Sequence, residues 1–195
     1  MRSFLAISGL CAATFALAVS TVPAMAQQHS VTVSGQADQM CTLGTPELGV
    51  GAIENFNNPS GSVFSITDLA DATTLSTRGA RITVSMQAMC TSLHRVEISS
   101  DGDGLWRVGG ATVPLGIADA VPYRAVLFWA AEESSFDAQA QTRQVHRMEA
   151  LVGHPATGEM LLQFEIQAGE TNAGFGVPLV AGDYSDVLRV TLEVQ

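Results

Sequence analysis

The stretch that decides the fold is the ending of the chain, Leu188-Arg-Val-Thr-Leu-Glu-Val194. Its apolar positions alternate with polar ones and are Leu188, Val190, Leu192 and Val194. Strict alternation is typical of a β-strand with one face on a core and the other in water, because successive side chains point to opposite faces. We therefore expect the chain to end in a half-buried strand.

Strand-like runs continue upstream of this ending. They are residues 30–34, residues 80–86 with Ile82, Val84 and Met86 on one face, Val96 and Ile98, Tyr123–Trp129 and residues 159–166. Turn residues separate the runs at residues 55–61, 99–104 and 169–176. Short strands joined by such turns favour an all-β fold, and we expect a single β-sandwich. Residues 130–151 are rich in Ala, Glu, Gln and Arg, so helix, strand and loop all stay open there.

Composition and charge narrow the class of protein. Hydrophobic residues make up 47% of the 195 residues and charged residues 14%, which excludes a disordered chain. The nine basic residues are all arginine, and with 19 acids the formal net charge is −10. This balance argues against nucleic acid and anionic lipid as partners, because both attract basic surfaces.

Residues 1–26 have the pattern of a secretory signal peptide. Arg2 precedes an apolar run, and Ala24 and Ala26 stand where an A-x-A cleavage site requires small residues. The alternative is a membrane anchor, but the apolar run is short for a span of about 20 residues. We expect export through the inner membrane, with Gln27 as the first mature residue and no insertion into a membrane.

Removal of the signal peptide would leave two cysteines, Cys41 and Cys90. In an exported protein an even count favours a disulfide. The alternatives are a metal pair, which needs more ligands at short spacing, and a redox pair, which is usually C-x-x-C. A bridge closing this loop contributes about 4 kcal/mol in the chain-entropy model, and we expect it to tie the first strand to a neighbour across the sandwich.

Several motifs together resemble one known family. They are Cys41-Thr-Leu-Gly, Ile82-Thr-Val-Ser before Cys90, the strand and Gly-rich turn at residues 96–104, Tyr123-Arg-Ala-Val-Leu-Phe, and an ending with Gly182, Tyr184 and Asp186 in a Gly-x-Tyr-x-Asp turn before the last strand. On these motifs the mature chain resembles the spore coat protein U-like domain, which includes the pilins of archaic chaperone–usher pili.

The resemblance implies a fold and a mode of assembly. Residues 41–195 would form an immunoglobulin-like β-sandwich that lacks its last strand and has one disulfide. A periplasmic chaperone would lend a strand, and the N-terminal extension of a neighbouring pilin subunit would replace it at the outer-membrane usher. The terminal strand, with Leu188, Val190, Leu192 and Val194, would line the acceptor groove. The implied function is a structural subunit of a surface fibre, or fimbrium, with a role in adhesion or biofilm. The alternative is an exported free-standing binding or adhesive module.

Residues 27–40 would be the donor strand. At about 3.3 Å per residue they span up to about 46 Å. The positions that share one face of an extended segment are Val31, Val33, Gly35 and Ala37. The alternative interpretation is that Val31 and Val33 belong to the domain's own first strand.

We expect no enzyme activity, cofactor or metal site. Asp101-Gly-Asp-Gly104 begins like a calcium loop, but no carboxylate follows at EF-hand spacing. His29, His94, His146 and His154 are scattered. The adjacent Glu132 and Glu133 would point to opposite faces of a strand, so they are poor candidates for a carboxylate pair and are expected in a solvated loop.

Overall fold

The computed structural model describes residues 31–51, 53–57, 62–109 and 113–195. The chain divides into two units between Gln36 and Ala37. The expected signal peptide, residues 1–26, lies outside the described residues.

In the described part of the chain the regular structure is β throughout, and no helix is present that is long and apolar enough to cross a membrane. The strands are β1 Cys41–Leu43, β2 Glu47–Leu48, β3 Ala80–Cys90, β4 His94–Ser100, β5 Leu105–Arg107, β6 Ala120–Val121, β7 Tyr123–Trp129, β8 Glu132–Ala138, β9 His146–Val152, β10 Ala156–Ile166, β11 Tyr184–Ser185 and β12 Leu188–Val194.

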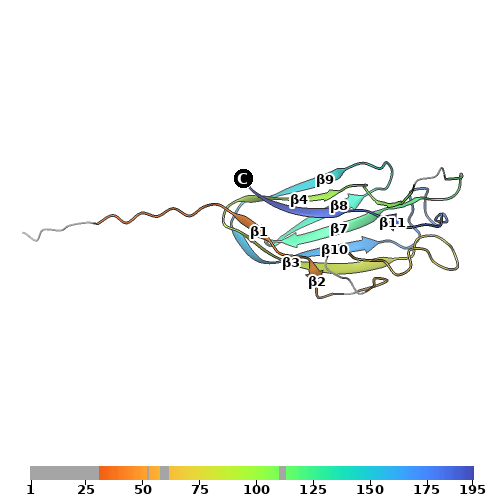
Figure 1. Cartoon of the computed structure of the whole chain (residues 1–195), viewed down its shortest axis with the longest axis horizontal. Helices are drawn as coiled ribbons and strands as arrows, with labels where there is room; N and C mark the ends of the chain where they lie inside the picture. The colour runs from red at the N-terminus through yellow and green to blue at the C-terminus, as the bar shows by residue number, and fades with distance from the viewer. Residues whose placement is uncertain (1–30, 52, 58–61, 110–112) are drawn as a thin grey trace, which may run out of the picture. The chain divides into compact units, whose positions relative to one another are not determined.

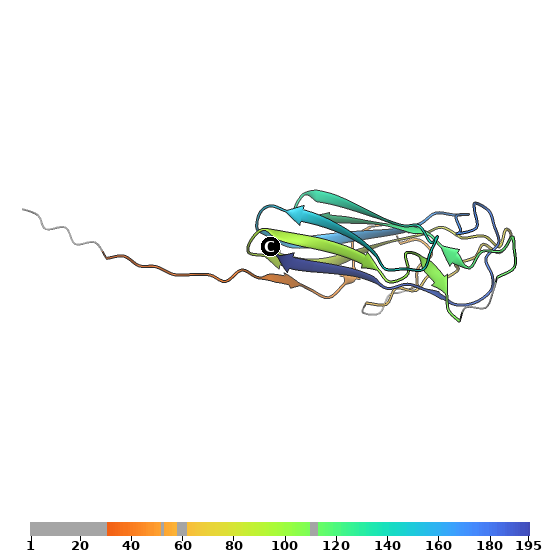
Figure 2. The ribbon, with the colours of Figure 1, turned by 90° about the horizontal axis from the view of Figure 1, so that it is seen from above.

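The strands form two main layers, and all ladders between them are antiparallel. One sheet has the order β1-β3-β10-β7-β8, with β2 also paired to β3, and the other has the order β12-β4-β9. Figures 1 and 2 show these sheets as separate layers. A small third sheet, β11-β5-β6, lies at the end of the domain opposite to the C-terminus (Figure 1). The all-β expectation is therefore confirmed.

The core fills the space between the two layers. Inward side chains of β3, β7, β8 and β10 meet those of β4 and β9. The largest fully buried apolar side chains are Phe136, Ile82, Ile98, Leu127, Met160, Ile166 and Val121. Strand β7 lies between β10 and β8, as expected for a strand at a sheet centre, but only one of its faces is fully buried, since Arg124 on the other is exposed.

Residues 130–151, which the sequence left open, contain β8 and most of β9. Strand β8 forms a hairpin with β7, and β9 then pairs with β4 in the other sheet. Long-range pairing therefore overrides the helix-friendly composition of this region. The expectation of a solvated loop at Glu132 and Glu133 was wrong, because both belong to β8.

The disulfide between Cys41 and Cys90 is confirmed. It does not tie strands across the sandwich. Cys41 and Cys90 are direct partners in the ladder between β1 and β3, with their Cα atoms 4.1 Å apart, so the bridge fastens a three-residue edge strand to its neighbour in the same sheet. A strand so short has few ladder hydrogen bonds, and the covalent bond holds it at the sheet edge.

Candidate functional site

The free edge of β12 is the candidate site. Strand β12 pairs with β4 over its whole length, from Leu188 opposite Ser100 to Val194 opposite His94. Within the described residues no strand forms a ladder with its other side. Strand β1 packs near β12 but forms its ladder with β3. The expected terminal strand, Val187–Gln195, is thus confirmed as Leu188–Val194, one residue shorter at each end, and it lies at the edge of its sheet.

The hydrogen-bond register decides which backbone groups face this edge. The Asp101 N–H donates to the Val187 carbonyl (3.1 Å), and the Gln195 N–H donates to the Leu93 carbonyl (3.3 Å). In an antiparallel pair the bonding residues alternate, so the odd-numbered residues of β12 bond to β4. The backbone N–H and C=O groups that point to the free edge are those of Leu188, Val190, Leu192 and Val194.

The same four residues direct their side chains toward the core, but they are only half-buried. Their neighbours on β4 are fully covered: Val96 is 3% exposed and Ile98 0%. Val190 lies opposite Ile98 and Leu192 opposite Val96. The half-buried side chains of β12 therefore stand directly beside fully buried side chains of β4. An apolar row and a row of outward backbone groups therefore coincide on one edge. This edge has the features that pair with an added strand.

The Gly-x-Tyr-x-Asp turn fixes the start of β12. Gly182 has φ +149°, and a Cβ there would lie 3.1 Å from side-chain carbons of Arg107, so glycine suits both the backbone and the space. The Tyr184 hydroxyl donates to the Val180 carbonyl (2.7 Å), which closes the turn.

Asp186 connects this turn to the interior. Its Oδ2 accepts hydrogen bonds from Ser100 Oγ (2.5 Å) and the Tyr123 hydroxyl (2.6 Å). Its Oδ1 accepts from the N–H groups of Gly102 (2.9 Å) and Val187 (2.8 Å). One carboxylate thus joins the start of β12 to the end of β4, the following turn and β7.

Two further polar pairs, which the sequence pattern does not reveal, join strands in the interior. The Trp129 indole N–H donates to His94 Nε2 (2.8 Å), so His94 Nδ1 carries the proton and donates to the Ser92 carbonyl (3.0 Å). His146 Nδ1 donates to the buried Asp103 Oδ1 (2.7 Å). These residues are scattered in sequence, and no local motif signals either pair. The described residues contain no group of three or more His, Cys, Asp or Glu that could hold a metal ion.

The expected donor residues belong to no strand of the structure. Residues 31–40 have no regular secondary structure and are exposed. Val31 is 87% exposed and Val33 91%. The strand expected over residues 30–34, of which residue 30 lies outside the described residues, is therefore wrong for residues 31–34 of this structure, and the domain's own first strand is β1. A segment without a ladder partner has no hydrogen bonds to hold it as a strand.

Both tyrosines of the chain are held in the protonated form. Burial raises the pKa of Tyr184 to about 12. Burial raises the pKa of Tyr123 further, and its hydrogen bond to the Asp186 carboxylate adds to this. Since the folded pKa values exceed the unfolded ones, this contribution to stability is complete below pH 10 and is lost as the pH rises through about 12.

An alkaline titration therefore reports on this region. We expect no phenolate absorbance from the folded chain near pH 10, and both tyrosines to ionise together with the loss of near-ultraviolet circular dichroism at higher pH. The urea-unfolded chain, as control, titrates near pH 10. Two tyrosines that ionise near pH 10 in a chain with intact circular dichroism contradict this.

Neither a scan against protein-family models nor a search of curated proteins finds a match for this chain.

Proposed function

We propose that this chain is a structural subunit of a surface fibre that assembles by donor-strand exchange. The N-terminal extension of one subunit adds as a strand to the free edge of β12 in the next. The observation that carries this proposal is the edge itself, where the half-buried row from Leu188 to Val194 coincides with outward backbone groups.

The strand order supports an immunoglobulin-like sandwich without its last strand. In a complete sandwich of this kind, strands A, B, E and D form one sheet and strands C, F and G the other. Here β1, β3, β10 and β7 occupy the places of A, B, E and D, while β4 and β12 occupy those of C and F. The assignment follows chain order, and β8 and β9 are additions after D. The strand without a counterpart is G, which belongs beside β12.

The extension supplies what this edge lacks. Val31 and Val33 are large apolar side chains on one face of an extended segment, followed on that face by Gly35 and Ala37. Both valines are exposed in the isolated chain, and covering one valine stabilises by about 1.5–3 kcal/mol. Hydrogen bonds to the four β12 residues whose backbone groups point to the free edge fix the register of the added strand.

The resemblance to spore coat protein U-like pilins, together with the signal-peptide pattern of residues 1–26, supports the route of assembly. The chain is exported to the periplasm, where a chaperone covers the β12 edge until an outer-membrane usher brings the next subunit. The fibre then lies at the cell surface, and its role is adhesion or biofilm formation.

Size-exclusion chromatography of the chain from Gln27 onward, with and without residues 27–40, tests the proposal. We expect the longer form to polymerise or to be poorly soluble. The truncated form should not polymerise, and a peptide of residues 27–40 should raise its melting temperature. A peptide with Ser in place of Val31 and Val33 is the control. A free-standing binding module predicts instead a stable monomer that neither needs residues 27–40 nor binds the peptide, and this result overturns the proposal.

A further inference from the structure

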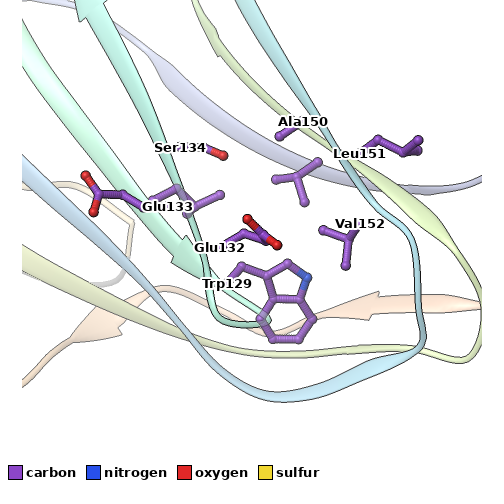
Figure 3. Close-up of a pocket in the computed structure, with 9 residues that line it drawn as sticks. Trp129, Glu132, Glu133, Ser134, Ala150, Leu151 and Val152 are labelled. Atoms are coloured by element: carbon purple, nitrogen blue, oxygen red, sulfur yellow. The ribbon is translucent and has the colours of Figure 1, made fainter.

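A cavity of about 140 Å³ lies between the two layers on the side away from β12. It opens between the edge strands β8 and β9 (Figure 3). Its lining combines apolar residues of both sheets with polar residues of β8. They are Val96, Leu127, Trp129, Glu132, Glu133, Ser134, Ala150, Leu151 and Val152.

The cavity exists because the inward face of β8 has large or apolar side chains toward the end of the strand and polar ones at its start. Phe136 and Ala138 fill the core and are 1% and 2% exposed. Ser134 and Glu132 lie on the same face, two and four residues before Phe136. The facing strand β9 contributes Ala150 to the cavity lining. Small side chains on both strands leave the space between the layers unfilled.

Glu132 is a carboxylate on the core side of its sheet. It is the cross-strand partner of Trp129, which is buried, and Figure 3 shows its carboxylate beside the indole ring. The neighbouring Glu133 also lines the cavity, but its side chain belongs to the opposite face of β8, and its carboxylate points away from that of Glu132 in Figure 3. Among the described residues Glu132 has neither a hydrogen bond nor an ion pair. The site therefore has an apolar floor and an uncompensated negative charge at its mouth.

We propose that this cavity binds a short alkylammonium group. The hydrocarbon stem lies against Val96, Leu127 and Val152, and the ammonium group lies at Glu132 beside the Trp129 ring, an arrangement that favours cations. The size fits, because a dry cavity of about 150 Å³ accommodates benzene. The chain contains no lysine, so neither its own side chains nor those of another copy supply such a group. The source is a free amine or a lysine of a different protein. This proposal does not depend on the proposed function.

Saturation-transfer NMR with n-butylammonium as probe tests the site, because it detects weak ligands on free or assembled protein. We expect saturable transfer to n-butylammonium, and we expect n-butanol to bind more weakly by a factor of up to about five, as loss of a charge pair near the surface predicts. Glu132→Gln should weaken binding of n-butylammonium by up to about fivefold, because Glu132 is exposed, and Ala150→Leu, which fills the cavity, should abolish it.

Asp137→Asn, on the exposed outward face of β8 and outside the cavity lining, is the matched control and should leave the affinity for n-butylammonium unchanged. Nα-acetyl-lysine methylamide distinguishes the two sources: binding comparable to that of n-butylammonium assigns the site to a lysine side chain, and exclusion assigns it to a free amine. The proposal is overturned by absence of saturable transfer, by equal binding of n-butanol, or by equal effects of Glu132→Gln and Asp137→Asn. Melting curves of each variant confirm that the fold is intact.

Discussion

Replacement of Val33 by aspartate is expected to abolish fibre assembly and to leave the isolated subunit as stable as before. Val33 is 91% exposed in the single chain and belongs to no strand, so its replacement removes no contact that holds the domain together. In the proposed fibre the same side chain is covered by the next subunit. The variant loses about 1.5–3 kcal/mol of burial and places a charge against apolar side chains. A total of about 4 kcal/mol corresponds to a thousandfold weaker association.

Thr32→Asp is the matched control for this experiment. Thr32 adjoins Val33 and points to the opposite face of an extended donor, so the same added charge remains in water. We expect normal fibre yield for Thr32→Asp, no fibre for Val33→Asp, and equal melting temperatures of the two monomers. Equal fibre yields from the two variants, or a monomer destabilised only by Val33→Asp, would contradict a donor strand that acts in a neighbouring subunit.

The parts of the fold that the sequence predicted well are those in which alternation alone determines burial. The alternating run from Leu188 to Val194 is strand β12, and Ile82, Val84 and Met86 all face the core. In each case one apolar face is sufficient to orient the strand. The disulfide followed from cysteine arithmetic, although its position within one sheet required the ladder register.

The strand β8 shows why the rest was not predictable. Its inward face contains Glu132 and Ser134 before Phe136, so the alternation that marks a half-buried strand is interrupted where the cavity lies. Its composition allowed a helix, and only pairing with β7 selects the strand. The hydrogen bond between Trp129 and His94 likewise joins residues 35 positions apart, and neither local sequence reveals it.

The candidate site was predictable in its residues but not in its geometry. Alternation indicated that Val190 and Leu192 face inward, yet complete and incomplete sandwiches share this pattern. Only the ladder shows that β12 is an edge strand, that these residues are half-buried, and that their backbone groups point outward. The donor residues remain a prediction, since a segment that pairs in another subunit has no partner in the single chain.

Loss of the Asp186 carboxylate is expected to be among the most destabilising single changes in this domain. Its partners are shielded from water: Ser100 is 0% exposed and Tyr123 is 4% exposed. Asp186→Ala leaves the Ser100 and Tyr123 hydroxyls without their acceptor and removes the shorter of the two hydrogen bonds of the Gly102 N–H, which keeps only the Ser100 Oγ at 3.3 Å. An unsatisfied buried donor costs about 1–3 kcal/mol, so we expect a loss of about 3 kcal/mol or more in the free energy of unfolding, measured by urea denaturation.

The nearby Asp183 provides the control for this prediction. It is exposed, and it receives the Val108 hydrogen bond through its backbone carbonyl, which Asp183→Ala retains. We expect Asp183→Ala to change the unfolding free energy by less than about 0.5 kcal/mol. Asp186→Asn keeps the size and one acceptor oxygen but directs an amide toward two hydroxyl groups, so its stability should fall between the wild-type and alanine forms. If Asp186→Ala were no less stable than Asp183→Ala, the carboxylate would not hold the start of β12 to the core. The terminal strand would then be held by its ladder with β4 alone.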